Sequence, residues 1–198
     1  AVAGAVAGTL LDGIHSKDGL QIYDTLPLVI GGLKTSWAVP PLLAAFYVVL
    51  GSLAPLADAA VGGDGDEATL QVRERSADPA WIAASAGALA AELQLSAYAY
   101  ATGMPFSAIF VMLGAVTVAN WAVFDRTRQG IALAALCALG APAAEIVLLQ
   151  LVPLWHYPRA DILGGAFVSW VPWCYAFYTP FLTNLARHLW SRTHSGLA

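Results

Sequence analysis

Charged residues are scarce in this sequence. Lysine and arginine together number 9, and aspartate and glutamate 13, so 11% of the 198 residues are charged. An average soluble domain has about 25%. Hydrophobic residues make up 59% of the chain, and the mean hydropathy is +0.66. This balance excludes an ordinary soluble domain and predicts an all-α, polytopic membrane protein. The net charge of −4 and the lack of a basic patch exclude a nucleic-acid partner.

Cysteine and histidine are also few. The two cysteines, Cys137 and Cys174, both lie inside apolar runs. There they are typical of small core residues rather than of a disulfide or a metal pair. The sequence has no Cys/His metal spacing, no glycine loop for a phosphate and no Ser–His–Asp set at one depth. We therefore expect no enzyme activity, no cofactor and no metal.

Apolar runs of about 20 residues, the length that an α-helix needs to cross the hydrocarbon core, recur along the chain. Residues 12–36 are predicted to be a long connection, with His15 as a solvated loop residue, and residues 58–79 a polar loop. Tryptophans such as Trp37, Trp81 and Trp121 mark the run ends, as expected at membrane interfaces. The sequence thus predicts a single bundle, residues 1–198, of six transmembrane helices: an incomplete first span at 1–11 and full spans at 37–57, 80–102, 105–124, 131–154 and 162–188.

Arginine and lysine are distributed unevenly between the two sides of such a bundle. The loops at 58–79 and 125–130 share one side with the C-terminus. Because cytoplasmic loops carry the excess of these residues, both termini of this integral, multi-pass protein are predicted to be cytoplasmic. The predicted cytoplasmic side carries Arg73, Arg75, Arg126, Arg128, Arg187 and Arg192, and the opposite side carries Lys17, Lys34 and Arg159.

Several short motifs occur in a characteristic order. The turn between the fourth and fifth runs reads Trp-x-x-Phe-Asp-Arg-x-Arg-x-Gly over residues 121–130. Trp37 with Pro40-Pro41 opens the second span, and Ser169-Trp170-Val-Pro172, followed by Asn184 and Arg187, marks the last. This ordered set, over roughly residues 10–190, resembles the insulin-induced gene (Insig) family of sterol-regulatory membrane proteins. The alanine-rich, lysine-poor composition indicates a prokaryotic homologue.

The resemblance implies a function as well as a fold. Insig proteins are six-span bundles that bind oxysterols, retain the escort protein Scap in the endoplasmic reticulum and deliver a reductase of sterol synthesis for degradation. It therefore implies a lipid-sensing, regulatory role of the kind that serves cholesterol metabolism. The family's aspartate in Phe-Asp-Arg contributes to binding Scap. A partner-binding site for another membrane protein is accordingly expected at Phe124, Asp125 and Arg126.

Two carboxylates lie inside predicted spans. Glu92 and Glu145 would each sit roughly 18–21 Å deep at about 1.5 Å per residue, slightly past the middle of the membrane. An ionised carboxylate facing lipid there costs at least about 2.5–3.5 kcal/mol. Both must therefore face the bundle interior or a wet cavity, or be protonated. Three hypotheses remain open: a structural role, a ligand site for a lipid head group, and a proton relay.

Polar residues near these glutamates complete a predicted ligand site. Ser96 follows Glu92 by four positions and shares its helix face, whereas Gln94 does not. Our hypothesis is that a sterol or glycerolipid binds in an intramembrane cavity; the alternative is a small proton-coupled transporter or channel. Small residues such as Gly4 and Gly8 permit close helix contact, and a homo-oligomer is expected. The predicted ligand-binding residues are Glu92, Ser96, Tyr98, Glu145 and Gln150.

Overall fold

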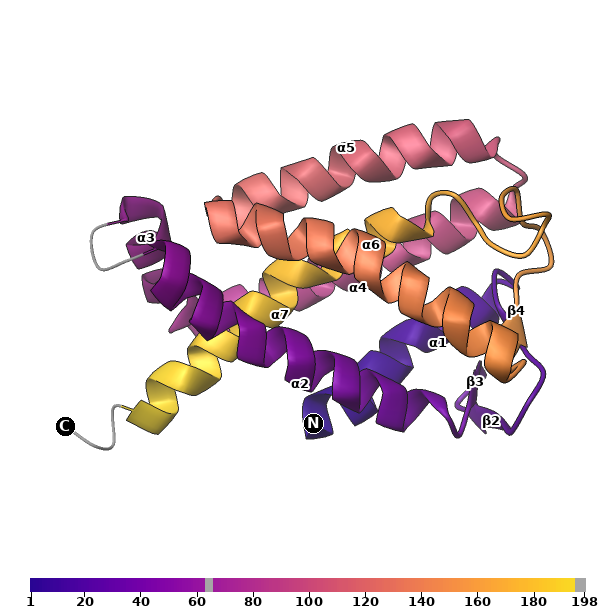
Figure 1. Ribbon diagram of the computed structural model, residues 1–198, viewed down its shortest axis with the longest axis horizontal. Coiled ribbons are helices and arrows are strands. Elements are labelled where there is room, and N and C mark those ends of the chain that lie inside the picture. The colour runs from indigo at the N-terminus through magenta and orange to yellow at the C-terminus, as the bar shows by residue number, and fades with distance from the viewer. Residues whose placement is uncertain (63–65, 195–198) are drawn as a thin grey trace.

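The computed structural model describes residues 1–62 and 66–194, and over these it is a bundle of long helices with two small β-sheets (Figure 1). The bundle is formed by η1–α1 (Gly4–Gly8 and Thr9–Lys17), α2 (Val39–Ala57), α4 (Pro79–Ala101), α5 (Phe106–Phe124), α6 (Arg128–Leu151) and α7 (Val171–His194). This confirms the predicted helical membrane bundle. Among the described residues, three helices are long and apolar enough by composition to cross a membrane: Val39–Val61, Phe106–Phe124 and Arg128–Leu151.

Helix α7 lies at the centre of the bundle, in contact with α2, α3, α4, α5 and α6 (Figure 1). Its aromatic side chains explain this position. Phe177, Tyr178 and Phe181 are buried on α7, and Trp170, just before the helix, is fully buried. A helix that is apolar on several faces lies either among other helices or in lipid, and the contacts of α7 with five helices show the first case here. The aromatic residues of α7 therefore form much of the core.

The first helix extends beyond its predicted end. Residues 12–17 continue it as α1, although they were expected to belong to a connection, and His15 is helical rather than solvated in a loop. Glycine allows close packing here: a Cβ added to Gly4 would lie 2.5 Å from the Leu43 carbonyl oxygen of α2. The Gly4–Gly8 motif is thus used for contact inside the chain, and the packing carries polar residues of α1 into the bundle.

The rest of the predicted connection forms short strands. β2 (Pro27–Ile30) and β3 (Leu33–Ser36) pair as an antiparallel hairpin. Its turn is Gly31-Gly32, with φ of 55° and 91°, a region that glycine adopts without strain. β1 (Ile22–Tyr23) instead pairs with β4 (Trp155–His156), which follows α6. The β1–β4 pair thereby ties the first connection to the end of α6.

The predicted polar loop at 58–79 is also partly helical. η2 (Asp58–Gly62) continues α2, and α3 (Glu67–Ser76) follows. The Asp66 side chain caps α3 by accepting a hydrogen bond from the Thr69 amide at 2.9 Å. Bonds from the Thr69 hydroxyl and amide hold the pKa of the Asp66 carboxyl below its usual value. Asp78 caps α4 in the same way, through the Ala80 amide at 2.8 Å.

The boundaries of the last two spans were partly wrong. α6 begins at Arg128, ends at Leu151 and continues through Pro142. The sixth span was expected from residue 162, but α7 begins only at Val171 and runs to His194. Asp161 holds the intervening loop, because its carboxylate accepts hydrogen bonds from the Ser169 amide and hydroxyl at 2.8 and 2.6 Å. These local bonds replace the helical ones that the apolar composition had suggested.

Candidate functional site

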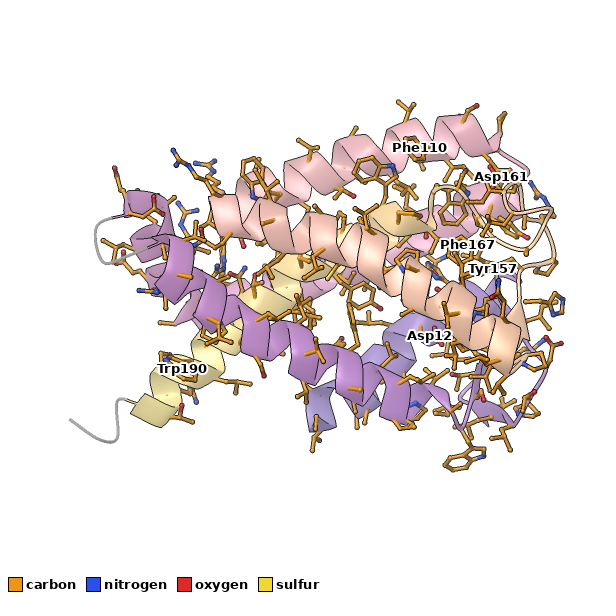
Figure 2. All side chains as sticks on the ribbon, viewed as in Figure 1. Asp12, Phe110, Tyr157, Asp161, Phe167 and Trp190 are labelled. Carbon is orange, nitrogen blue, oxygen red and sulfur yellow. The ribbon has the colours of Figure 1, made fainter. Side chains whose placement is uncertain are left out.

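A cavity of about 230 Å³ lies among α1, α2, α6 and α7. One end is polar and is lined by Asp12, His15, Gln21, Glu145, Trp155 and Tyr157. The remainder is mostly apolar, with Leu42, Leu43 and Phe46 of α2 facing Ala141 and Leu148 of α6. Figure 2 marks Asp12 and Tyr157 at the same end of the bundle. We call this end of the bundle, with its polar lining residues Asp12, Gln21 and Glu145, the cavity end.

Glu145 is the best-coordinated residue of the cavity end. Its Oε1 accepts hydrogen bonds from Trp155 Nε1 at 2.9 Å and from the Tyr157 hydroxyl at 2.5 Å, and its Oε2 accepts one from the Tyr175 hydroxyl at 2.7 Å. Only 5% of Glu145 is exposed. At about 1.5 Å per residue it lies roughly 26 Å from Arg128 and 9 Å from Leu151, so it is nearer one membrane surface than predicted. Three neutral donors orient this carboxylate.

Asp12 is a second carboxylate at the same end. It accepts hydrogen bonds from the Tyr23 hydroxyl and, at 3.4 Å, from the Thr35 hydroxyl. Tyr23 pairs with Trp155 across the β1–β4 sheet, and their rings meet edge to face at 5.8 Å. The sheet thus links the partners of Asp12 to those of Glu145. Sequence reasoning missed Asp12 because it placed the residue in a connection.

Ser96 reaches the cavity indirectly, through His15. Its hydroxyl donates to the Leu93 carbonyl oxygen at 2.9 Å and lies 3.0 Å from His15 Nε2. Since the serine hydrogen is engaged, its oxygen accepts from Nε2–H, and Nδ1 of a neutral His15 ring carries the lone pair. Ser96 therefore fixes the orientation of a lining residue but does not itself line the cavity.

Glu92 lies apart from this cavity. It lines an apolar groove between α4 and α5, together with Ala88 and Asn120. Only 3% of Glu92 is exposed, and neither carboxylate oxygen has a hydrogen-bond partner among the described residues, although the Cys174 thiol is nearby. The structure thus separates Glu92 from Glu145, which were predicted to act in one site.

The last two predicted ligand residues lie on the outer surface of the bundle. Tyr98 is 63% exposed, and Gln150 is also exposed. Neither lines the cavity or the groove. Helix periodicity explains their position: Tyr98 is six residues after Glu92 and Gln150 five after Glu145, so neither shares its glutamate's face.

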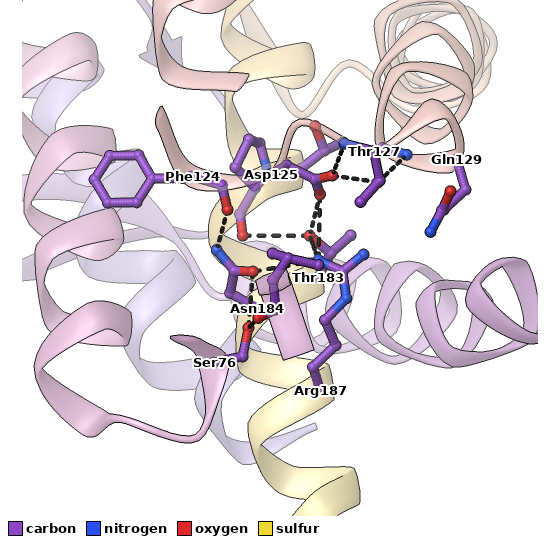
Figure 3. Close-up of polar contacts among 12 residues, drawn as sticks. Ser76, Phe124, Asp125, Thr127, Gln129, Thr183, Asn184 and Arg187 are labelled. Carbon is purple, nitrogen blue, oxygen red and sulfur yellow. Dashed lines mark hydrogen bonds and ion pairs between the residues drawn. The ribbon is translucent and has the colours of Figure 1, made fainter. Parts of the chain in front are cut away.

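Asp125 of the predicted partner site points into the bundle (Figure 3). Its Oδ1 accepts hydrogen bonds from the Thr127 amide, at 2.9 Å, and hydroxyl, and its Oδ2 accepts from Thr183 and Arg187, both at 3.3 Å. A Cβ on Gly130 would come within 2.3 Å of Oδ1, which explains the glycine of this motif. Asp125 therefore joins α5, α6 and α7.

Arg187 also binds a second carboxylate in the same cluster, that of Asp58. Its Nε and Nη2 donate to the two oxygens of Asp58 at 2.8 and 2.9 Å, in the two-pronged geometry that guanidinium favours. Gln129 donates to Asp58 at 2.9 Å. We call this cluster, Asp58, Asp125, Gln129 and Arg187, the arginine end. It lies on the side opposite the cavity end.

The other two predicted partner residues differ in exposure. The ring of Phe124 lies 4.9 Å from that of Trp81, and its carbonyl oxygen accepts a hydrogen bond from Asn184 at 3.0 Å (Figure 3). Arg126 is exposed and has a positive φ of 64° at the α5–α6 turn. Of the three, Arg126 is the residue whose side chain is available at the surface.

Two solved structures share this architecture. The Insig homologue MvINS from Mycobacterium vanbaalenii aligns with a TM-score of 0.72 and 23% identity over 96% of this chain and 90% of its own. The fold is that of an Insig homologue. A cross-linked MvINS trimer aligns with a TM-score of 0.70 and 23% identity over 94% of this chain and 89% of that one. No family model matches the chain, and no curated protein does. The Insig resemblance and the six-helix membrane bundle predicted from the sequence are confirmed at the level of fold.

Proposed function

We propose that this integral membrane protein is a non-enzymatic, Insig-type lipid-binding protein that holds one amphipathic lipid in the cavity between α1, α2, α6 and α7. One observation supports this most: the cavity joins a cluster of hydrogen-bonding side chains to an apolar body. A lipid head would lie against Asp12, Gln21 and Glu145, and its chain against Leu43 and Phe46. Sites of this kind place a few polar groups in an otherwise apolar lining.

The size of the cavity supports partial enclosure of such a lipid. Its 230 Å³ is below the roughly 300–1,000 Å³ of sites that enclose a whole drug-sized ligand. The head and the first part of a chain would fit, and the rest would extend between helices into the bilayer. Of the sterol and glycerolipid expected from the resemblance, a ligand with a slender chain suits this volume better.

A sensing role follows from the position of the cavity. The ligand would touch α1, α2, α6 and α7 at once, and α7 also contacts α4 and α5. Binding would stabilise one arrangement of these helices, which a partner at the Arg126 surface could detect. We also propose a homo-oligomer, supported by the cross-linked trimer of MvINS.

Native mass spectrometry of the detergent-purified protein, with identification of co-purifying lipid, tests the proposal. We expect one lipid per protomer. Ala144→Trp, which fills the cavity from α6, should abolish this signal. Leu139→Trp is the matched control, because Leu139 of α6 is 75% exposed on the outer surface. A protein that is lipid-free, and is not stabilised by added sterols or glycerolipids, would refute the proposal.

A second candidate function is proton-coupled transport. It is favoured by the buried carboxyl of Glu92, whose oxygens have no hydrogen-bond partner among the described residues. Intramembrane carboxylates of this kind often bind and release protons. Proton flux into liposomes that Glu92→Gln and Glu145→Gln each abolish would support this function, whereas flux equal to that of empty liposomes would exclude it.

A further inference from the structure

Some polar groups of the cavity end have no hydrogen-bond partner among the described residues. Gln21 lines the cavity and is only 6% exposed as a residue, and its side-chain amide forms no hydrogen bond with a described residue, which leaves it facing the cavity. The two hydrogen bonds that Asp12 accepts both go to Oδ2, leaving Oδ1 without one among the described residues. An amide that faces a cavity and has no protein partner can hydrogen-bond to water or to a ligand there. Gln21 therefore offers a hydrogen-bonding group to a ligand independently of the two carboxylates.

The charges of the cavity lining have one sign. Asp12 and Glu145 both line it, and they are close enough for each to influence the other electrostatically. No lysine or arginine belongs to the described lining. The donors to both carboxylates are neutral hydroxyl and indole groups, which orient a carboxylate without cancelling its charge. His15 contributes an imidazole whose Nε2 is already engaged by Ser96.

We propose that the lipid bound in this cavity carries a protonated amine head, which Asp12, Gln21 and Glu145 recognise together. This inference rests on the proposed function and specifies its ligand class. An ammonium group has three donors and no acceptor. It complements a site with two carboxylates and the carbonyl of an unpartnered amide, and it neutralises charge in a poorly solvated interior.

Other head groups fit this lining less well. A phosphate would add negative charge beside two carboxylates where no basic residue of the described lining could bind it. A hydroxyl could donate one hydrogen bond but would bring no charge. The small enclosed volume favours a single-chain amine, such as a long-chain amino alcohol, whose tail continues into the bilayer.

Three chain-matched probes separate these head chemistries: hexadecylamine, hexadecanol and hexadecyl phosphate. Each is titrated against the detergent-purified protein, with native mass spectrometry and the melting temperature as readouts. We expect the amine to bind at least about tenfold more tightly than the alcohol, and the phosphate not to compete. Equal or tighter binding of the alcohol would overturn the amine proposal while leaving a lipid-binding protein. If no probe binds and no lipid co-purifies, the proposed function falls as well.

Substitutions locate the effect within the cavity. Asp12→Asn and Gln21→Met should each weaken amine binding about tenfold and change alcohol binding less than about twofold. Asp18→Asn is the matched control, since it removes the same charge from a carboxylate that bonds Gln94 at 2.7 Å and does not line the cavity. An equal loss in Asp18→Asn would reduce the effect to general electrostatic attraction and refute the proposal. Gln21→Met breaks no side-chain hydrogen bond to a described residue, so it remains informative if Asp12→Asn is unstable.

Discussion

The buried carboxylates at the two ends of the bundle have different hydrogen-bond and ion-pair partners. At the arginine end, Asp58 and Asp125 share the guanidinium of Arg187, with contacts of 2.8 to 3.3 Å. At the cavity end, Asp12 and Glu145 accept hydrogen bonds from tyrosine, threonine and tryptophan, and no ion pair to either forms among the described residues. The first arrangement compensates charge within the chain, whereas the second orients charge and leaves it uncompensated.

This difference supports a structural role for the arginine end and the proposed binding role for the cavity end. A buried ion pair with its hydrogen bonds complete leaves nothing for a ligand to satisfy, and it connects the segments that contribute to it. At the cavity end, the carboxylates of Asp12 and Glu145 and the amide of Gln21 can still accept hydrogen bonds from a ligand in the cavity. By this criterion the Asp125 motif holds the helices together, and a partner that depends on Asp125 would recognise the turn it shapes.

The largest expected effect is at the arginine end. Arg187→Met leaves Asp125 without a cation and leaves Asp58 with only Arg73, whose Nε lies 3.6 Å from an Asp58 oxygen. It should lower the free energy of unfolding by about 3–5 kcal/mol. Chemical unfolding in detergent, followed by tryptophan fluorescence, measures it. Arg126→Met removes an exposed arginine from the adjacent turn and should change stability by less than about 0.5 kcal/mol. Similar losses in both variants would contradict the assignment of Arg187 as the central cation.

The two membrane glutamates should respond in opposite directions. Glu145→Met leaves three donors unpaired, so we expect a loss of about 3 kcal/mol at roughly 1 kcal/mol for each bond. Glu92→Met removes a buried carboxyl without a hydrogen-bond partner and should raise stability by about 1–2 kcal/mol. Unfolding of both variants under one condition is the test. A destabilised Glu92→Met would reveal a partner for Glu92 and weaken the contrast.

A smaller effect is expected from one methyl group beside Asp125. Gly130→Ala places a Cβ 2.3 Å from an Asp125 oxygen that Thr127 holds in place, and should cost about 1–3 kcal/mol. Gly140→Ala is the matched control in α6, because its Cβ would come no closer than 3.9 Å to its nearest neighbour. That variant should be neutral or slightly stabilising. Thermal unfolding of the pair separates overpacking from helix propensity.

The smallest effect concerns Asp66, which caps α3 beyond the arginine end. Its folded pKa lies below the ordinary value of 3.8, so its contribution is present above about pH 4 and is lost as the pH falls through the folded value. The wild type should therefore lose stability relative to Asp66→Asn between about pH 4 and pH 2. Melting temperatures at both pH values test this, and a constant difference would exclude the cap.

Much of the fold was predictable because it depends on composition and on neighbours in sequence. Apolar runs located the helices α2, α4, α5 and α6 to within a few residues, since burial in hydrocarbon requires such runs. The start of α4 depends on such neighbours, because Asp78 caps the helix and Pro79 occupies its first turn. The start of α7 was wrong because residues 162–170 are apolar enough for a helix, while Asp161 and Ser169 stabilise a loop there.

The candidate site was less predictable. Glu145 was identified as a buried polar group, but its donors Trp155 and Tyr175 come from β4 and α7. Asp12 and Gln21 both fell in the predicted connection at residues 12–36. Only the close packing of Gly4 against α2 and the pairing of β1 with β4 bring them to Glu145. The hydropathy of the sequence does not predict these contacts, because they join residues that are far apart in the chain.

The sequence by itself determined that the chain is a membrane bundle, where its helices run and which carboxylates must be shielded, because these follow from the cost of placing polar groups in hydrocarbon. Tertiary structure decided which carboxylate obtains a cation and which only neutral donors. Arg187 reaches Asp58 and Asp125 across large separations in sequence, and no cation of the described lining reaches Glu145. Those long-range contacts separate a charge-compensated cluster from a cavity whose two carboxylates have only neutral donors.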